Sequence, residues 1–292
     1  MTEGTCKLGF SVDMLLPSAR GGGPLKIGLA KLDESQWLEP EPDLTVRAAA
    51  FDAYPESVQL TREAEAPSDE LAAMLGVSGG LEGAARSRWE DMCLLARRAD
   101  EEVYRLIGAA VAFPTDWEPA KKMGLPLAAM HAPIDNYAEQ LATPVDRFMA
   151  KLKPGAIYGR CNWFVASTDA LHWVGEPPEQ AFAHVTPENA GETLYVRSER
   201  QTLRRLPETQ AILFTIGVHV APLGSLSGAN IAFMAEALAT IPGNEARRRG
   251  AAYFAPQLQA FAARHASHIR HPELVSGSIS PHAPSLERRD GC

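Results

Sequence analysis

The residues with the densest chemistry lie in the run LYVRSERQTLRRLP, which begins at residue 194. Its first residues alternate, so Tyr195, Arg197, Glu199 and Gln201 are expected on one face of a strand. Two arginines, a glutamate and a glutamine within five residues are costly to bury unless they pair or hold a polar ligand. Two interpretations are open at this point: a ligand-binding polar cluster, or a solvated strand face with Arg–Glu pairs.

A second strand is expected directly after this run. The segment LPETQ has the residues of a turn, and AILFTI at 211–216 has the β-branched and aromatic content of a buried strand. The sequence therefore predicts a β-hairpin whose first strand carries the polar cluster and whose second strand lies in the core.

One histidine stands in an unusual setting, the stretch FPTDWEPAKKMGLPLAAMHAPIDNY at 113–137. His131 lies there between apolar residues, and it is either a core residue with satisfied nitrogens or a metal ligand or catalytic group. His219, on the apolar strand after FTI, is its main rival, and the other histidines lie in or near a Pro-rich loop and the C-terminal tail. Lys26 also lies among apolar neighbours, where it either extends to water or meets an anionic group.

Composition places the chain among ordinary globular proteins. The 292 residues are 46% hydrophobic and 22% charged, and 28 basic against 36 acidic residues give a net charge of −8. This balance argues against nucleic acid or an anionic membrane as a partner of the whole molecule. The N-terminal run LGFSVDMLL is too short to span a bilayer and contains Asp13, so we expect no signal peptide, no membrane span and a cytoplasmic location.

Cysteine spacing excludes two further kinds of site. The four cysteines, Cys6, Cys93, Cys161 and Cys292, lie far apart and form no CxxC pair. They build no local iron–sulfur or zinc site and suggest no disulfide framework.

The elements that must position these residues follow from periodicity and turn signals. Strands are predicted at 104–113, 156–167, 194–203 and 211–220, and helices at 61–98, 135–151, 230–241 and 244–265, with a Pro- and Glu-rich loop at 175–191. We expect a flexible arm over residues 1–23, one folded domain over 24–266 and a disordered tail over 267–292.

Four segments occur in the same order in one known family: WEDMCLL, AFPTDWEPAKKMGLPLAAMHAPIDNYAEQL, RCNWFV and LYVRSERQTLRRLPETQAILFTI. From about Lys26 to about Ile241 the chain resembles the haem-dependent oxidative N-demethylase family, specifically its haem-binding alpha-subunit-like members. The resemblance implies an α+β, PAS-like fold, an antiparallel sheet with surrounding helices, enlarged by N- and C-terminal helical extensions. It also implies haem b bound in the interior of that domain.

The resemblance assigns roles to individual residues. His131 is the implied proximal iron ligand, because it is the only histidine within a family motif and neutral imidazole suits iron. Glu199 and Lys26 are the implied catalytic residues, and Glu199 would hold a protonated amine and move its proton. The residues expected to contact the cofactor, besides His131, are Arg197, Asn162, Trp163 and His219.

The implied activity is oxidation of the N-methyl group of a small amine with O2. Electrons would come from a separate NADPH-dependent reductase carrying FMN and a 2Fe-2S cluster, because this chain has no Rossmann glycine fingerprint and no cysteine cluster. The alternatives are a haem-based gas or redox sensor and a family member that has lost haem.

Three departures from the family pattern bear on the substrate pocket. The usual Pro-Val-Pro after the histidine is Pro133-Ile134-Asp135 here. The usual valine before the Glu-Arg-Gln core is Ser198, and the usual arginine and tyrosine after FTI are Gly217 and His219. The last pair lies close to the central block, so we expect a pocket that differs from that of the amine demethylases.

Overall fold

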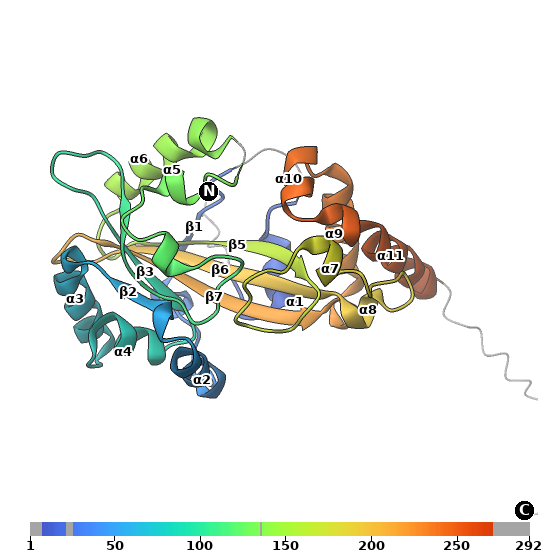
Figure 1. Cartoon of the computed structure of the whole chain (residues 1–292), viewed down its shortest axis with the longest axis horizontal. Helices are drawn as coiled ribbons and strands as arrows, with labels where there is room; N and C mark the ends of the chain where they lie inside the picture. Colours follow the sequence, from blue (N-terminus) through green and yellow to red (C-terminus); the bar gives the residue numbers. More distant parts are fainter. Residues whose placement is uncertain (1–7, 22–25, 135, 271–292) are drawn as a thin grey trace, which may run out of the picture.

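A seven-stranded antiparallel sheet is the frame of the molecule (Figure 1). The computed structural model describes residues 8–21, 26–134 and 136–270. The strands, in the spatial order β1-β5-β6-β7-β3-β4-β2, are β1 (Ala30–Leu32), β2 (Val58–Leu60), β3 (Asp91–Ala96), β4 (Arg105–Ala110), β5 (Ile157–Ala166), β6 (Tyr195–Arg205) and β7 (Ile212–Pro222). The α+β prediction is confirmed.

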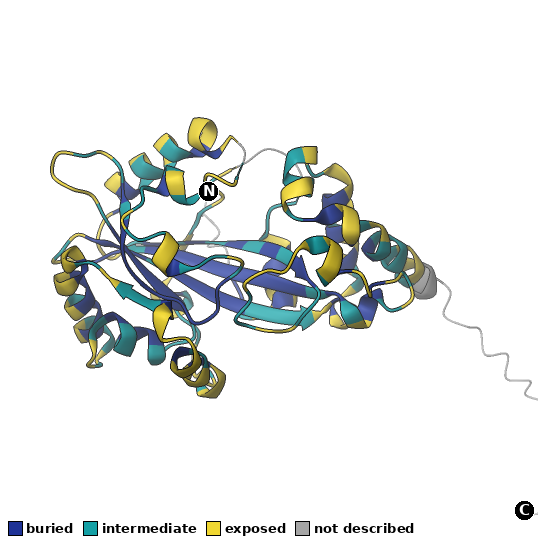
Figure 2. Cartoon of the chain, viewed as in Figure 1, coloured by how far each residue is buried: buried dark blue, intermediate teal, exposed yellow. Residues whose placement is uncertain are grey.

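The predicted hairpin is the longest strand pair of the sheet. β6 and β7 pair antiparallel from Tyr195 opposite Pro222 to Arg205 opposite Ile212, and β5 pairs with the other edge of β6. Both β6 and β7 are buried along most of their length (Figure 2). The polar run of β6 therefore lies in the middle of the sheet and not on a solvated face.

Helices cover both faces of the sheet. The α-helices are α1 (Val12–Leu15), α2 (Thr45–Ala53), α3 (Glu65–Leu75), α4 (Gly80–Arg86), α5 (Leu127–Met130), α6 (Thr143–Lys151), α7 (Pro178–Ala181), α8 (Ala190–Thr193), α9 (Gly228–Thr240), α10 (Gly243–Arg248) and α11 (Ala255–Arg270), and a π-helix, η6 (Ala138–Ala142), precedes α6. Helices α5 and α6 lie on one side of the left half of the sheet and α2 to α4 on the other (Figure 1).

The helix predicted over 61–98 is correct only in its first two thirds. Helices α3 and α4 lie there, but Asp91–Ala96 forms β3, paired with β4 and β7. The first five residues of β3 are buried because helices cover both faces. A strand buried on both sides is apolar without alternation, and its sequence is then easily taken for a helix.

Two further predicted elements differ from the structure. The helix expected over 244–265 is divided into α10 and α11 at Gly250, whose φ of 64° places it in the left-handed region that ends helices. The loop expected over 175–191 contains α7 and the start of α8.

A flexible N-terminal arm was predicted over residues 1–23. Its described residues, 8–21, pack against the rest of the domain. Val12, Leu15 and Leu16 are buried, and Val12 and Leu16 pack with residues of β5, β6 and α9. At the other end, α11 continues to Arg270, past the predicted domain limit of 266. Residues 271–292 of the predicted tail lie outside the described residues.

Candidate functional site

A row of polar side chains crosses one face of the sheet where β5 and β6 pair. Arg160 lies opposite Gln201 and Asn162 opposite Glu199, so the four side chains share this face. The Arg160 Nε donates to Gln201 Oε1 at 2.8 Å, and Gln201 Nε2 donates to Glu199 Oε2 at 2.8 Å. Glu199 is only 7% exposed. The interpretation of this row as a solvated face is therefore wrong.

Arg160 also connects the row to the segment before β1. Its Nη1 donates to the Ile27 carbonyl at 3.0 Å. Lys26, adjacent to Ile27, is exposed. The described part of this segment therefore places the Lys26 backbone next to the row, while its side chain extends to solvent, as an isolated lysine among apolar neighbours usually does.

His131 lies at the C-terminal end of α5, on the side of the sheet that carries the polar row. Its Nδ1 is 2.8 Å from the Leu127 carbonyl oxygen, and because a carbonyl only accepts, Nδ1 carries the proton. The ring stacks on Tyr137, with centroids 4.4 Å apart and planes 13° apart. Burial lowers the pKa of His131, and the positive charges of Arg160, Lys122 and Arg248 lower it further.

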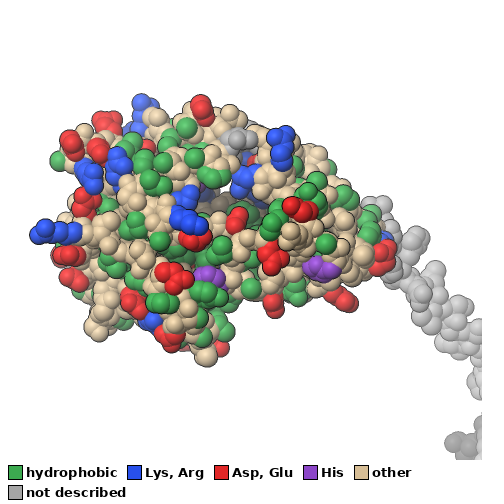
Figure 3. All heavy atoms as spheres, in the orientation of Figure 1, with side chains coloured by type: hydrophobic (Ala, Val, Ile, Leu, Met, Phe, Trp, Pro, Cys, Tyr) green, Lys and Arg blue, Asp and Glu red, His purple; other side chains and the backbone are tan. Residues whose placement is uncertain are grey.

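This arrangement fits a metal ligand. A neutral imidazole whose Nδ1–H is held by a carbonyl presents the lone pair of Nε2, and metal-binding histidines in proteins commonly have this bond. The stacked Tyr137 ring limits rotation of the imidazole. The molecular surface is hollowed between α5–α6 and α10 (Figure 3). An imidazole with a fixed tautomer, near enough to the Arg160 guanidinium for that charge to lower its pKa, suits a haem with its anionic propionates.

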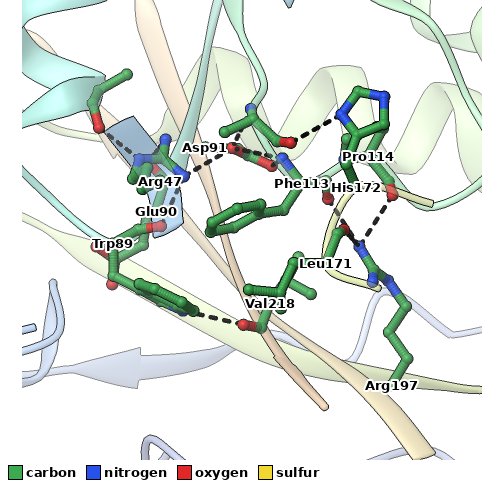
Figure 4. Close-up of polar contacts among 12 residues, drawn as sticks. Arg47, Trp89, Glu90, Asp91, Phe113, Pro114, Leu171, His172, Arg197 and Val218 are labelled. Atoms are coloured by element: carbon green, nitrogen blue, oxygen red, sulfur yellow. Dashed lines mark hydrogen bonds and ion pairs between the residues drawn. The ribbon is translucent and has the colours of Figure 1, made fainter. Parts of the chain in front are cut away.

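The Arg197 guanidinium, which the sequence suggested as a cofactor contact, forms hydrogen bonds with two loops. It donates to Thr115 Oγ1 and to the carbonyl oxygens of Phe113, Pro114, Ala170 and Leu171, at 2.7 to 3.1 Å. Figure 4 shows it reaching the loop carbonyls. Its donors are therefore engaged in holding two loops over the sheet, and we do not assign it to a propionate.

Two of the predicted cofactor contacts lie on the opposite face. Trp163 follows Asn162 on β5, so its side chain points the other way, and its Nε1 donates to the Arg20 carbonyl at 2.9 Å. His219 pairs with Ser198, which flanks Glu199 on β6, so it too faces away from the polar row. Of the predicted site residues, the structure thus gathers His131, Glu199, Asn162 and Arg197 on one side, with the Arg197 donors bound to the two loops.

A second group of polar side chains surrounds His219 on that opposite face. His219 Nε2 lies 3.8 Å from Glu39 Oε2, and these two residues line a pocket of about 310 Å³ with Pro42, Asp43, Val46 and Trp89. Burial, and next the charge of Glu90, raise the pKa of Glu39 to about 7. Burial, and next the charge of Arg200, lower the pKa of His219 to about 4.

These two shifts predict opposite pH dependences of stability. Glu39 contributes to the unfolding free energy below its ordinary pKa of 4.5, and this contribution is lost as pH rises through about 7. Stability from His219 is present above its ordinary pKa of 6.5 and is lost as pH falls through about 4. For each of Glu39→Gln and His219→Gln, the unfolding free energy at pH 5 is compared with that at pH 8 by urea unfolding. Relative to the wild type, we expect this difference between the two pH values to change by about 2 kcal/mol, in opposite directions in the two variants. The prediction is contradicted if both variants show the same difference in unfolding free energy between pH 5 and pH 8 as the wild type.

Two contributors to the site were not predicted from the sequence. Arg160 bonds to Gln201 and anchors Ile27, and Tyr137 supports His131. Alternation along IYGRCNWFVA places Arg160 and Asn162 on one strand face, and this signal was sufficient to find Arg160. The stack on Tyr137 depends on how the chain turns between α5 and the π-helix, which periodicity does not report.

Two whole-chain properties limit the kinds of site. Within residues 8–21, 26–134 and 136–270 no group of three or more His, Cys, Asp or Glu side chains is arranged to hold a metal ion. A haem iron needs fewer protein ligands than that, so this finding does not bear on a haem site. The same residues contain no helix that is both long and apolar enough to cross a bilayer.

One model of a known protein family matches most of the chain. A sequence model described as "Haem-dependent oxidative N-demethylase, alpha subunit-like" matches residues 48–258. The match covers the polar row, His131 and both strands of the hairpin, and it extends past Ile241, where the segment-by-segment resemblance ended. The chain belongs to the haem-dependent oxidative N-demethylase, alpha-subunit-like family.

Proposed function

We propose that this protein is a haem-dependent oxidative N-demethylase that removes a methyl group from a small amine. The observation that carries the proposal is the imidazole of His131, with its Nδ1–H held by Leu127, on the side of the sheet that also carries Glu199 and Arg160. Membership of the family supports haem as the cofactor. O2 and electrons from a separate NADPH-dependent reductase with FMN and a 2Fe-2S cluster complete the proposed reaction.

A PAS-like core is part of this proposal. Strands β4-β3-β7-β6-β5 are five adjacent strands of one antiparallel sheet, and α5, η6 and α6 lie in the connection between β4 and β5. That connection packs against the face with the polar row (Figure 1). A ligand between a sheet and the helices of such a connection is held by rigid elements on both sides.

Each residue of the site has a proposed task. His131 would hold the haem iron through Nε2, and Arg160 would pair with a propionate. When bound, haem supplies the oxidising chemistry that no protein side chain can perform. The Glu199 carboxylate would bind the ammonium group of the substrate and accept its proton, so that the nitrogen lone pair is free when the methyl group is oxidised. Gln201 would orient that carboxylate, since its Nε2 donates to Glu199 Oε2.

A sensor role remains the competing function, and turnover distinguishes the two. The departures at Gly217 and His219 do not favour a sensor, because both residues lie on the face away from Glu199. A visible spectrum of the purified protein tests for haem. Formaldehyde release from dimethylamine, with a flavin and iron–sulfur reductase and NADPH, tests for demethylation. Haem binding without any turnover of small methylamines would support the sensor.

Glu199→Gln isolates the proposed proton acceptor. The change keeps the side-chain shape and removes the negative charge, so we expect an unchanged haem spectrum and a fall of about 100-fold in amine turnover. Glu192→Gln, at an exposed glutamate of α8, is the matched control and should keep wild-type turnover. Turnover of Glu199→Gln within twofold of the wild type would remove Glu199 from the mechanism.

A further inference from the structure

The pocket beside His219 has the features of a second binding site. It lies on the face of the sheet opposite Glu199 and Arg160, so it is separate from the proposed haem site. Its lining combines an aromatic ring, two apolar side chains, two carboxylates and an imidazole, contributed by Trp89, Pro42, Val46, Glu39, Asp43 and His219.

Several polar atoms in and beside this pocket are buried without a hydrogen-bond partner. They include Glu39 Oε2 and His219 Nε2, which face each other at 3.8 Å, and Glu90 Oε2. The His219 side chain is only 10% exposed and Glu90 is fully buried. Buried polar atoms are normally satisfied, so such a group indicates an unseen partner. A group that donates two hydrogens can satisfy both Glu39 and a neutral His219.

The charges around the pocket favour a cation. The charge of Glu90 raises the pKa of Glu39, and the charges of Arg200 and Arg47 act in the opposite direction on Glu90. Asp43 adds a further carboxylate at the mouth, and its pKa is lowered by the Thr45 backbone N–H, so it is ionised at neutral pH. Asp43 and the ionised form of Glu39 therefore place negative charge beside the Trp89 ring, a surface that attracts organic cations.

Gly217 on β7 lies beside the same cluster of side chains. A Cβ at Gly217 would lie 3.5 Å from Glu90 Cγ and 3.6 Å from His219 Nε2, which is ordinary contact distance. A side chain introduced at Gly217 would therefore start in contact with both residues. Because no group of three or more acidic, Cys or His side chains in the described ranges is arranged for a metal, an N–H-bearing organic cation suits the site better than a metal ion.

We propose that this pocket binds a small organic ammonium ion, with its N–H groups donating to Glu39 and His219 and its alkyl group against Trp89 and Val46. The site is distinct from the one proposed for haem and amine oxidation, and its occupancy does not require haem. An ammonium bound here adds a cation to the buried carboxylates of Glu39 and Glu90 and stabilises the folded protein.

Ethylammonium chloride is a suitable probe because it has no N-methyl group to be oxidised. We expect saturable binding in the millimolar range, as befits a ligand of so few atoms, measured by calorimetry and by the shift of the His219 side-chain 15N signal. Glu39→Gln and His219→Leu should each weaken binding at least about tenfold. Glu41→Gln, at an exposed carboxylate two residues from Glu39, and His131→Ala, on the haem side, should leave it unchanged.

Filling the space from within the chain gives an independent test. In Gly217→Arg a guanidinium is placed beside Glu90 and His219, where it should compete with the probe. We expect this variant to lose ethylammonium binding and to melt at a higher temperature than the wild type, while any haem spectrum is unchanged. Undiminished binding in Gly217→Arg would place the probe elsewhere on the protein.

The pH dependence provides the third readout. Glu39 is surrounded by Glu90, Arg200, His219 and Asp43, and its pKa of about 7 means that it is mostly protonated at pH 6 and ionised at pH 8. Ethylammonium keeps its charge over this range, so affinity should fall about tenfold from pH 8 to pH 6. The proposal is overturned if no binding is detected, if ethanol binds as well as ethylammonium, or if Glu39→Gln binds as the wild type does.

Discussion

His131→Ala is expected to lose haem. The purified variant should lack the Soret band that the wild type shows after haem is supplied, because the imidazole proposed to hold the iron is gone. Changing a residue that merely hydrogen-bonds to a metal ligand typically costs about 10- to 100-fold in affinity, and loss of the ligand itself should cost more than about 100-fold. Haem titration followed by visible absorption measures this directly.

Two controls make the His131 result specific. His219→Ala removes the rival histidine, which lies on the opposite face, and should keep wild-type haem affinity. Added imidazole should restore a Soret band to His131→Ala, because a free ring can occupy the vacated space beside Tyr137. The ligand assignment fails if His219→Ala loses haem and His131→Ala retains it. A colourless wild type after haem is supplied would instead favour a family member that has lost the cofactor.

Prediction from the sequence was most accurate where a residue pattern is compatible with only one local structure. Alternation along β6 correctly placed Arg197, Glu199 and Gln201 on one face, since successive side chains of a strand point to opposite faces. The family motifs pointed to His131, which the structure then places on the same side of the sheet as Glu199. Neither inference depended on how distant segments pack.

The sequence could not show the register between strands, nor which segments cover each face of the sheet. His219 was a plausible pocket residue until pairing with Ser198 placed it on the other side of the sheet from Glu199. Asn162 and Trp163 were both assigned to the cofactor, although neighbours on a strand point in opposite directions. β3 was missed because helices on both sides make it uniformly apolar, so its pattern carries no period. Arg197 was predicted to contact the cofactor, and the sequence could not show that its guanidinium donates to distant loop carbonyls.

A buried ion pair below the loop after β4 should have the largest effect on stability. Arg47 Nη1 and Asp91 Oδ1 are 2.9 Å apart, and their side chains are 0% and 1% exposed (Figure 4). Arg47 also donates to the carbonyls of Ala85, Trp89 and Glu90. Asp91 accepts from the backbone N–H groups of Ala112 and Phe113, and so holds the loop whose carbonyls Arg197 binds from the other side.

Arg47→Leu is therefore expected to destabilise the protein by about 3 to 5 kcal/mol, because it leaves the Asp91 carboxylate buried without its counter-charge. For a chain of this size the melting temperature should fall by about 10 °C. The matched control is Arg86→Gln on α4, whose ion pairs with Asp52 and Glu82 are partly exposed, and its cost should stay below about 1 kcal/mol. Removing both charges in Arg47→Leu/Asp91→Leu should cost less than the sum of the single changes, because no unpaired charge then remains buried. Additive costs in this cycle, measured by urea unfolding, would show that the two side chains stabilise the loop separately and not as a pair.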